Sequence, residues 1–572
     1  MPIGSLSAKD EKINVITEGS SIFLQVPRYQ RGYAWNTDNI DDMLSDLQSV
    51  PKGSFFFGTL ILHIRPNEEN TFDLIDGQQR MTSITIMLSV IRDLLKDLGC
   101  IEESYEIHNQ ISTKPLGGER THRLMPCAEL KENDFFAKYI QNKNIEEIAP
   151  VNISQQHVVK NKKTFKNWIE ENLDSSSPNY PDQLMNLAVK MTQSKIILIK
   201  VEHAEDAYKI FESVNARGVD LSVADLLKNY LLTHIRETGP NEDPAAEKWL
   251  KMQKMVENLD LAITMPKFVR YSWISRYQFD SEKNMYRGIR DKVPAGRCDE
   301  FLSQLYDDGV MLTKIISCDI DENITPRYNQ CNKVLRNLRL TSTTQFLSFA
   351  LGLFRNTTRL KINKPDKILA KVESFVFRYN AVCNLPSNKV ERTFSRIGRA
   401  LENLIFTDET ELVTNRDKVI HNLVTTLAHF NPTSELFMEK FSDINYKTTP
   451  TQKSIIRRIF SIINSQLGTG ELTYDTNIEH ILPQKPQAWG LTEDEIEDYV
   501  NNIGNLTLIQ KQLNSRMGNK PFDEKLPLLN SSEIRINSTI EQFLDDGKWV
   551  EKSIQERANH LGSICDNATI NI

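Results

Sequence analysis

The sequence predicts a predominantly helical α+β protein built from more than one domain. Its 572 residues exceed what a single hydrophobic core normally organises. Strand-like runs fall within residues 1–205 and in one short C-terminal stretch, whereas residues 206–440 repeat apolar side chains every three or four positions. We therefore predict a mixed α/β domain over 1–205, a helical region over 206–440 that completes and links it, and a C-terminal domain over 441–572.

The first domain is predicted to alternate strands and helices. Runs rich in apolar, aromatic and β-branched residues predict strands, and these runs cover 21–27, 54–64, 71–76 and 195–201. Residues 36–50 carry apolar side chains at helical spacing, with Asn36 or Thr37 as the N-cap. Residues 81–99 form a second amphipathic pattern, which Gly99 ends.

Helical patterns continue through the middle of the chain. Residues 221–235 and 419–430 are examples in which the apolar positions line one helix face. The last region opens with a helix predicted over 452–467. A glycine-containing turn then leads into residues 477–484, whose pattern is not that of a simple core strand.

The composition is typical of a folded protein in a reducing compartment. Hydrophobic residues make up 40% and charged residues 25% of the chain. The seven cysteines are scattered and none forms a C-x-x-C pair, which argues against a disulfide framework or a zinc ribbon and favours the cytoplasm. No run has the length of a membrane span or the character of a signal peptide, so we expect no membrane partner. A net charge of -7 excludes a broadly basic protein but leaves room for a local basic groove.

Polar and aromatic residues crowd the connection that follows the first strong strand. Pro27 stops that strand, and the next eight residues include Tyr29, Gln30, Arg31, Tyr33 and Trp35. One interpretation is a packed surface loop anchored by the tryptophan. The other is a binding site in which the planar guanidinium group meets an anion and the aromatic rings flank a flat ligand.

A second polar segment, Leu74–Ser83, lies between a predicted strand and a long helix. Gly77 permits a tight turn, and the N-terminus of the helix offers N–H groups and a partial positive charge to a phosphate. Arg80 adds a full charge, and Asp76 could hold a metal ion or orient water. The alternative is that Asp76 caps the helix while the two glutamines beside it are solvated. The segment is not a Walker A loop.

The third segment is "NIEHILPQ", residues 477–484. If it is a strand, alternation sends Glu479 and His480 to opposite faces, so that each face mixes an apolar group with an ionisable one. A lone histidine in such a strand is most often structural. A functional interpretation therefore depends on other polar residues nearby in the fold.

Residues 503–526 supply those partners. They predict a strand and then a helix, and they carry Asn505 and Asn514. Together with the histidine they suggest a general base for water and a carboxylate–amide pair able to hold one divalent cation through oxygen ligands. Four basic residues in the same segment would grip DNA phosphates: Lys511, Arg516, Lys520 and Lys525.

With these motifs the chain resembles the GmrSD family of modification-dependent (type IV) restriction enzymes. The first part is similar to ParB/sulfiredoxin-like nucleotide-hydrolysing domains through "P-x-x-Q-R-x-Y-x-W" at Pro27–Trp35 and "D-G-Q-Q-R-x-T" at Asp76–Thr82. A further family segment stands at Phe211–Asn229. The last part is similar to His-Me finger (HNH) nucleases, which have a ββα-metal fold, and its matching residues are Glu479, His480, Pro483, Gln484, Trp489, Gly504, Asn505, Asn514, Asn519, Pro521, Phe522 and Lys525.

The resemblance implies a role for each matching residue. His480 would be the general base, Asn505 would orient it or the scissile phosphate, and Glu479 and Asn514 would be ligands of Mg²⁺ or Mn²⁺. The nucleotide site would comprise Gln30, Arg31, Asp76, Gly77, Gln78, Gln79 and Arg80. Weaker candidates from the Phe211–Asn229 segment are Asn215, Arg217 and Asp225, and Asp225 has an alternative role in a capping box with Ser222.

The function implied by the resemblance is a nucleotide-dependent DNA endonuclease of phage defence. Its partners would be a nucleoside triphosphate (ATP, GTP or another) and double-stranded phage DNA whose cytosines are hydroxymethylated, glucosylated or methylated, and the active form could be a homodimer. Two alternatives stay open. One is a sensor or nickase for another DNA mark such as phosphorothioate, and the other is a nucleotide-switched binding protein of abortive infection.

Overall fold

The chain forms two compact units, Met1–Ala246 and Glu247–Ile572. The computed structural model describes residues 6–571 except for 19–21, 28–29, 31, 52–53, 66–67, 69, 114–120, 127–129, 203–209, 211–221, 236–242 and 469–474. The predicted α+β class with a predominance of helix is confirmed, with a mixed sheet in the first unit. The boundary expected near residue 440 lies inside the second unit.

A six-stranded mixed sheet forms the centre of the first unit. Its strand order is β1-β8-β3-β4-β2-β7, with β8–β3, β4–β2 and β2–β7 parallel and β1–β8 and β3–β4 antiparallel. Four strands match the predicted runs, and two were not predicted. The bounds are β1 (Leu6–Lys12), β2 (Phe23–Gln25), β3 (Phe56–Ile64), β4 (Thr71–Asp76), β7 (Leu124–Met125) and β8 (Lys195–Val201).

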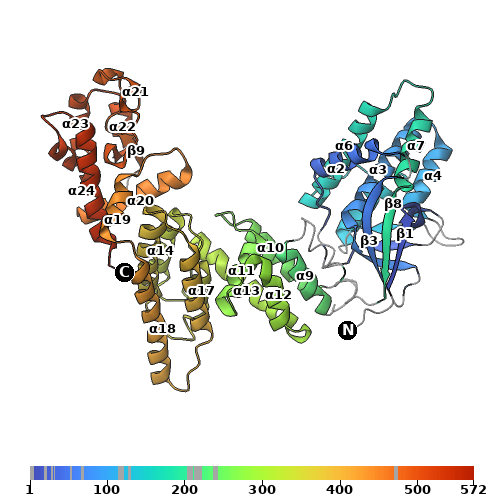
Figure 1. Cartoon of the computed structure of the whole chain (residues 1–572), viewed down its shortest axis with the longest axis horizontal. Helices are drawn as coiled ribbons and strands as arrows, with labels where there is room; N and C mark the ends of the chain where they lie inside the picture. Colours follow the sequence, from blue (N-terminus) through green and yellow to red (C-terminus); the bar gives the residue numbers. More distant parts are fainter. Residues whose placement is uncertain are drawn as a thin grey trace. The chain divides into compact units, whose positions relative to one another are not determined.

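Strand alternation gives the sheet two unequal apolar faces. Leu60, Leu62 and Leu74 face a large core that is covered by helices, including α3, which contributes buried residues along its whole length. Figure 1 shows α3, α6 and α7 layered beside the strands. Ile61 and Ile75 face the other way, where Leu226 of α9 packs against them. The helices of this unit are α1 (Asn14–Thr17), α2 (Thr37–Ser49), α3 (Gln78–Asp97), α4 (Ile101–Ile111), α5 (Leu130–Phe136), α6 (Ile153–Asn172), α7 (Tyr180–Thr192) and α9 (Val223–His234).

Helices make up most of the second unit. The first group is α10 (Pro244–Glu257), α11 (Met265–Arg276), α12 (Glu282–Lys292), α13 (Cys298–Ser317), α14 (Tyr328–Leu340), α15 (Leu347–Asn356), α16 (Pro365–Val376), α17 (Asn388–Glu402) and α18 (Glu409–Phe430). The second group, which includes a small hairpin, is α19 (Ser434–Ser442), α20 (Pro450–Gln466), β9 (Thr476–His480), α21 (Glu493–Ile496), β10 (Leu506–Gln510), α22 (Lys511–Met517), α23 (Phe522–Asn530) and α24 (Glu551–Thr569).

A buried ion network fixes the first helical group. The carboxylate of Asp308, which is fully buried, accepts hydrogen bonds from Ser272 (2.6 Å), Arg276 (2.8 Å) and Arg355 (2.9 Å). Burial opposes its charge, but the two guanidinium groups outweigh burial and hold the pKa of Asp308 below its ordinary value. Because a buried charge is costly without partners, this network strongly favours one arrangement of α11, α13 and α15.

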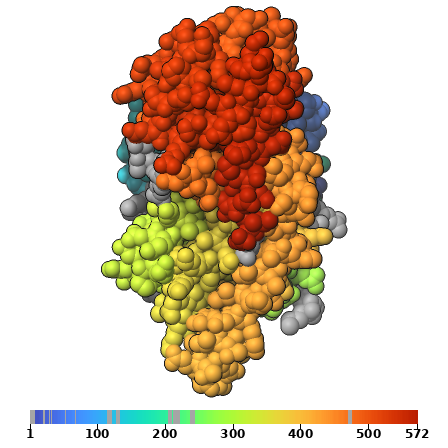
Figure 2. All heavy atoms as spheres, turned by 90° about the vertical axis from the view of Figure 1, so that its left-hand side faces the viewer, coloured from blue at the N-terminus to red at the C-terminus, as the bar shows by residue number. Residues whose placement is uncertain are grey.

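The C-terminal segment shares a core with the helices that precede it. Phe377 and Val382, which follow α16, pack in one cluster with Phe437, Ile459 and Leu561. The guanidinium group of Arg378 is fully buried and lies 2.5 Å from the carboxylate of Asp566 on α24. In the surface view, the residues near the C-terminus (red) cover one end of this unit (Figure 2). Among the helices that the structure describes, none is long and apolar enough to cross a membrane.

Close packing of α15 on α17 generates the first testable prediction. A Cβ added at Gly398 would lie 2.8 Å from the carbonyl oxygen of Ser348, which is backbone and cannot move aside alone. We expect Gly398→Ala to lower the free energy of unfolding by about 1–3 kcal/mol, the usual cost of overpacking. Urea denaturation measures this change. The matched control is Gly296→Ala, because a Cβ there meets no atom within 4 Å. Equal midpoints for the two variants would contradict the close packing.

Candidate functional sites

The junction of β4 and α3 gathers the polar residues predicted for a nucleotide. Asp76 ends β4, and Gly77 turns the chain with φ of 94°, in the left-handed region that glycine tolerates. A Cβ at this glycine would lie 2.0 Å from the side chain of Leu60, so the turn also requires the absence of a side chain. No side chain caps α3, so Asp76 is not its N-cap. A helix N-terminus of this kind favours an anion.

Arg80 is held from two sides at this junction. Its guanidinium group donates to the carboxylate of Asp76 (3.0 Å) and to the carbonyl oxygen of Phe57 (2.8 Å). Gly58 leaves room for it, because a Cβ at that position would lie 2.2 Å from Arg80 Nη1. The sequence motif did not point to Gly58, which lies more than twenty residues earlier in the chain. The arginine is thus oriented in advance and is only partly exposed.

The motif glutamines hold loops together. Gln79 Oε1 accepts hydrogen bonds from the backbone N–H groups of Ala34 (2.7 Å) and Trp35 (3.2 Å). Gln78 is buried and donates to the carbonyl oxygen of Pro126. The alternative interpretation expected both side chains to be solvated. Instead, both are engaged in hydrogen bonds to the backbone. They fasten the 32–35 connection and the segment after β7 to the start of α3.

Gln30 joins the two N-terminal motifs. Its amide donates to the carbonyl oxygens of Leu74 (3.0 Å) and Ile75 (2.6 Å), so it contacts the strand that leads to Asp76. The ammonium group of Lys228 on α9 lies 3.4 Å from the carbonyl oxygen of Gln30. This contact joins the family segment Phe211–Asn229 to the two N-terminal motifs. The predicted residues Tyr29, Arg31, Asn215 and Arg217 lie outside the described residues. Asp225 forms the capping box with Ser222 that was its alternative role.

A strand–strand–helix element carries the second site. β9 and β10 pair antiparallel, with His480 opposite Leu506 and Glu479 opposite Thr507. α22 follows β10 directly and packs against both strands. The alternation of the strand sends Glu479 and His480 to different surroundings, and the ammonium group of Lys525 lies 3.0 Å from Glu479 Oε1.

His480 is an uncharged imidazole with one ring nitrogen already engaged. Its Nε2 lies 3.2 Å from Asn501 Oδ1, and its ring meets Tyr446 edge to face at 5.1 Å. Burial lowers the pKa of His480 to about 4; the hydrogen bond that the ring donates to Asn501 Oδ1 opposes this shift, and the positive charge of Lys525 adds to it. The amide of Gln484 also donates to Asn501 Oδ1 (2.9 Å), which fixes this oxygen toward the histidine. At neutral pH the ring is therefore unprotonated.

Family models match both parts of the chain. The GmrSD restriction endonuclease N-terminal domain matches residues 11–232, and the GmrSD restriction endonuclease C-terminal domain matches residues 431–564. The chain belongs to the GmrSD restriction endonuclease family. It is accordingly a type IV restriction endonuclease, and its substrate is DNA. The comparison with curated proteins gave no match. The β4–α3 junction and His480 fall within the matched segments, one in each.

Lys525, which was expected to contact DNA in this GmrSD protein, lies inside the C-terminal core. Its side chain is 0% exposed, and its ammonium group donates to Glu479 Oε1 and to the carbonyl oxygens of His480 (3.0 Å) and Ile481 (3.2 Å). A buried and fully engaged ammonium group does not suit contact with a phosphate. The placement indicates that Lys525 positions the end of β9, on which the histidine stands.

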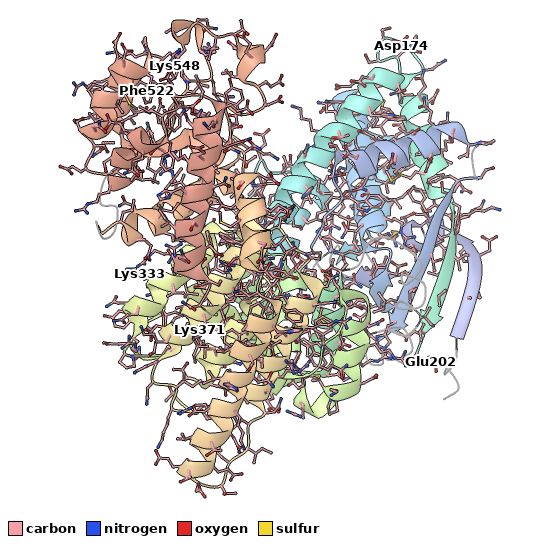
Figure 3. The ribbon with its side chains drawn as sticks, turned by 60° about the vertical axis from the view of Figure 1, so that its left-hand side comes forward. Asp174, Glu202, Lys333, Lys371, Phe522 and Lys548 are labelled. Carbon is pink, nitrogen blue, oxygen red and sulfur yellow. The ribbon has the colours of Figure 1, made fainter. Side chains whose placement is uncertain are left out.

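Aromatic packing explains how the lysine reaches this position. Phe522 at the start of α23 packs edge to face on Trp489 (5.8 Å) and stacks on Trp549 (6.0 Å). Figure 3 labels Phe522 within the C-terminal part of the chain. Lys525 follows three residues later, about one helical turn, and therefore points in the same direction as the anchored ring.

Asn505 also has a different place from the one expected. It is fully buried, its Oδ1 accepts from Leu482 N (2.8 Å) and Trp549 Nε1 (3.0 Å), and its amide donates to the carbonyl oxygens of Leu482 and Val500. These four bonds use its full capacity. The side chain holds the loop after β9 and does not contact the imidazole. Asn501 makes that contact instead.

The predicted metal ligands do not fit a divalent cation as they lie. Glu479 is the only carboxylate of the pair, and the Lys525 ammonium group beside it already balances its charge. Burial raises the pKa of Glu479 and lowers that of Lys525, while their mutual attraction opposes both shifts. Asn514 is half-buried on α22 and offers one amide oxygen. Among the described residues, no three His, Cys, Asp or Glu side chains group as a metal site.

The other basic residues of this segment are exposed. Lys511 begins α22 and pairs with Asp475 at 2.5 Å, Arg516 lies in the last turn, and Lys520 lies 3.7 Å from Glu524. Exposed pairs of this kind contribute little to stability and exchange readily for other partners. These three residues therefore remain predictions for contact with DNA phosphates.

The buried lysine yields a second prediction. Lys525→Met leaves Glu479 without its partner, and removing one member of a buried pair costs about 3 kcal/mol of unfolding free energy. The double variant Glu479→Gln/Lys525→Met should recover part of this loss, because neither charge is then left alone. Thermal or urea denaturation measures both. Lys548→Met is the matched control, since this lysine is exposed (Figure 3). Equal stability of Lys525→Met and Lys548→Met would mean that the buried contact does not form.

Proposed function

We propose that this chain is a nucleotide-dependent endonuclease that cuts foreign double-stranded DNA in the cytoplasm, with His480 as its general base. The observation that carries the proposal is the uncharged, oriented imidazole at the end of β9. If Nε2–H donates to Asn501 Oδ1, the lone pair is on Nδ1, and that nitrogen accepts the proton of an attacking water. Hydrolysis then breaks the phosphodiester bond and the leaving oxygen takes a proton.

The positioning of His480 depends on its neighbours. Tyr446 limits the rotation of the ring, Asn501 selects the tautomer, and Lys525 fixes the strand end through two backbone carbonyl oxygens. Strand, strand and helix in this order are also the arrangement of the HNH nucleases. We propose that cleavage requires Mg²⁺ or Mn²⁺, which would stabilise charge on the phosphate. Glu479 would join the ligands only if Lys525 moved away from it.

The proposed nucleotide site is the β4–α3 junction. It combines an uncapped helix N-terminus, the left-handed turn at Gly77 and the oriented guanidinium group of Arg80. A triphosphate would be attracted by all three. We propose that its hydrolysis regulates the nuclease and that the DNA is marked by modified cytosines. Cleavage of modified and unmodified phage DNA, each with and without nucleotide, tests this directly. Cleavage limited to phosphorothioate DNA would favour the sensor or nickase for that mark. No cleavage of any DNA would favour the nucleotide-switched binding protein of abortive infection.

The histidine gives a third prediction. His480→Ala should lower the rate of DNA cleavage by about 10²–10⁴-fold, the usual contribution of a general base. In the parent, the pKa of about 4 keeps the ring unprotonated down to about pH 5, so this group causes a loss of rate only as the pH falls through 4. Rates at saturating DNA across pH 4–8 measure both effects.

A control measurement separates the effect of His480 on DNA cleavage from any effect on the nucleotide site of the first unit. Nucleotide hydrolysis, measured without DNA, should stay at the parent rate in His480→Ala. Asn501→Ala should lower cleavage without abolishing it, because the base remains but its tautomer is no longer fixed. Full cleavage by His480→Ala would exclude this histidine as the base.

The junction gives a fourth prediction. Arg80→Gln removes the charge and Asp76→Asn releases the arginine, so we expect both variants to lose at least about tenfold in nucleotide hydrolysis, the scale of one lost charged contact to a phosphate. Phosphate release at saturating nucleotide is the measurement, and Arg65→Gln, which removes a guanidinium group elsewhere on the sheet, is the control. Parent rates in both junction variants would place the nucleotide elsewhere.

A further inference from the structure

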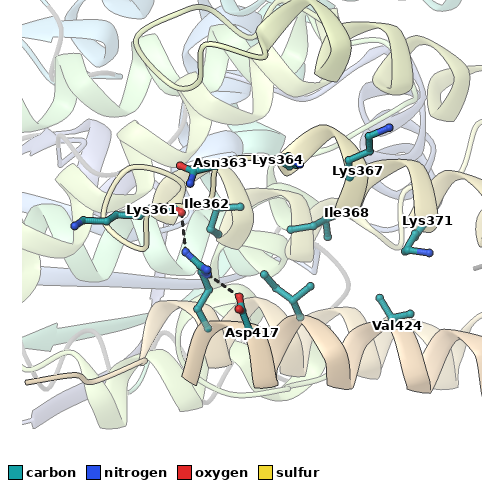
Figure 4. Close-up of a pocket in the computed structure, with 11 residues that line it drawn as sticks. Lys361, Ile362, Asn363, Lys364, Lys367, Ile368, Lys371, Asp417 and Val424 are labelled. Carbon is teal, nitrogen blue, oxygen red and sulfur yellow. Dashed lines mark hydrogen bonds and ion pairs between the residues drawn. The ribbon is translucent and has the colours of Figure 1, made fainter. Parts of the chain in front are cut away.

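A groove in the second unit carries an excess of positive charge. It has a volume of about 420 Å³ and lies between α18 and the segment that leads into α16 (Figure 4). Its lining residues fall between 361 and 424, outside both segments that the GmrSD models match.

The cations of the groove divide into two kinds. Arg416 is structural, because its guanidinium group donates to the carbonyl oxygens of Leu360 and Lys361 and to the carboxylate of Asp417. Lys361 pairs with Glu409 at 2.6 Å. The remaining cations are the side chains of Lys364, Lys367 and Lys371, and none of these has an ion pair within the described part of the chain.

These three lysines form a row. Lys364 is the N-cap residue just before α16, and Lys367 and Lys371 follow after three and four further positions. The two helical lysines share one face of α16, and Figure 4 shows them along that edge of the groove. At 1.5 Å per residue, the row extends over about 10 Å. Asp417 is the one carboxylate of the lining, and Arg416 already engages it. The whole chain is acidic, with a net charge of -7, so the row is a local feature.

The floor of the groove is apolar. Ile362 and Ile368 lie on one side and Ile420 and Val424 of α18 on the other. A low-dielectric wall beneath charges of one sign focuses their field toward the opening and attracts anions. The groove is therefore suited to an anionic ligand that extends past several lysines.

We propose that this row of lysines binds the sugar–phosphate backbone of duplex DNA. The inference rests on the proposed endonuclease function and names a contact that the function requires. A strand of DNA presents one phosphate per 3.4 Å of helix axis, so a row of about 10 Å spans more than one of them, whereas a single small anion would need only one lysine. Such contacts hold and orient the duplex without reading its sequence or its modification. Recognition of the modified base would take place elsewhere.

The test uses the full chain with His480→Ala, so that DNA is bound but not cut. In this background Lys364, Lys367 and Lys371 are replaced together by Gln. The matched control replaces three exposed lysines of other helices, Lys254, Lys267 and Lys292, by Gln, which gives the same change of net charge. Binding of a 30-base-pair duplex, unmodified or with hydroxymethylcytosine, is measured by fluorescence anisotropy from 50 to 300 mM salt. A parallel titration uses polyglutamate, and thermal melting verifies that each variant is folded.

The expected result is weaker binding of both duplexes by the groove variant alone. The slope of log K against log salt should become shallower by about 2–3 units, since each lost phosphate contact removes close to 0.9. Parent-like binding and slope in the folded groove variant would overturn the proposal while leaving the endonuclease function intact. Loss of polyglutamate binding alone would assign the groove to an acidic protein and also overturn it. If the background protein binds neither duplex, with or without a nucleoside triphosphate, the proposed function itself fails and the groove proposal fails with it.

Discussion

The geometry of the C-terminal site depends on one buried ammonium group. Lys525 donates three hydrogen bonds, to Glu479 and to the carbonyl oxygens of His480 and Ile481, and so satisfies every donor it has. Desolvating a charge is costly, and only full pairing of this kind makes the arrangement stable. The backbone from His480 to Ile481 is fixed as a result. The imidazole then meets Asn501 at a set distance, and the same positive charge helps to keep the ring unprotonated.

Amide side chains serve a comparable purpose in both units. Gln79 and Gln30 hold the N-terminal loops by binding backbone groups, and Asn505 does the same for the loop after β9. An amide can donate and accept hydrogen bonds at once. One side chain can therefore satisfy backbone N–H and C=O groups of a loop that has no regular secondary structure to pair them. Many of the polar residues that mark the GmrSD motifs thus form the framework of a site. Among the described motif residues, Arg80 in one unit and His480 in the other are the ones proposed to act on a ligand directly.

Local patterns were enough to predict much of the fold. The β-branched runs marked β3, β4 and β8, helical spacing marked α2 and α3, and alternation correctly separated Glu479 from His480. β1 was missed because its charged sequence is that of an exposed edge strand, and β7 because it has only two residues. The errors in the site have a different cause. Asn501 and Lys525 reach the histidine strand from 21 and 45 positions away, and no local pattern distinguishes a lysine that folds inward from one that stays in water.

The core shared by Phe377, Val382 and the C-terminal helices has an evolutionary consequence. The matched C-terminal segment starts at residue 431, yet Phe377 and Val382 of its apolar cluster, and Arg378, the partner of Asp566, come before that point. Recombination that joined the C-terminal segment to a different N-terminal half at the family boundary would expose part of the cluster and leave the buried carboxylate of Asp566 without its arginine. The unit of exchange among relatives should therefore be larger than the family segment. It should include residues 377–382, which follow α16, so that the C-terminal segment and this part of the helical region are inherited together.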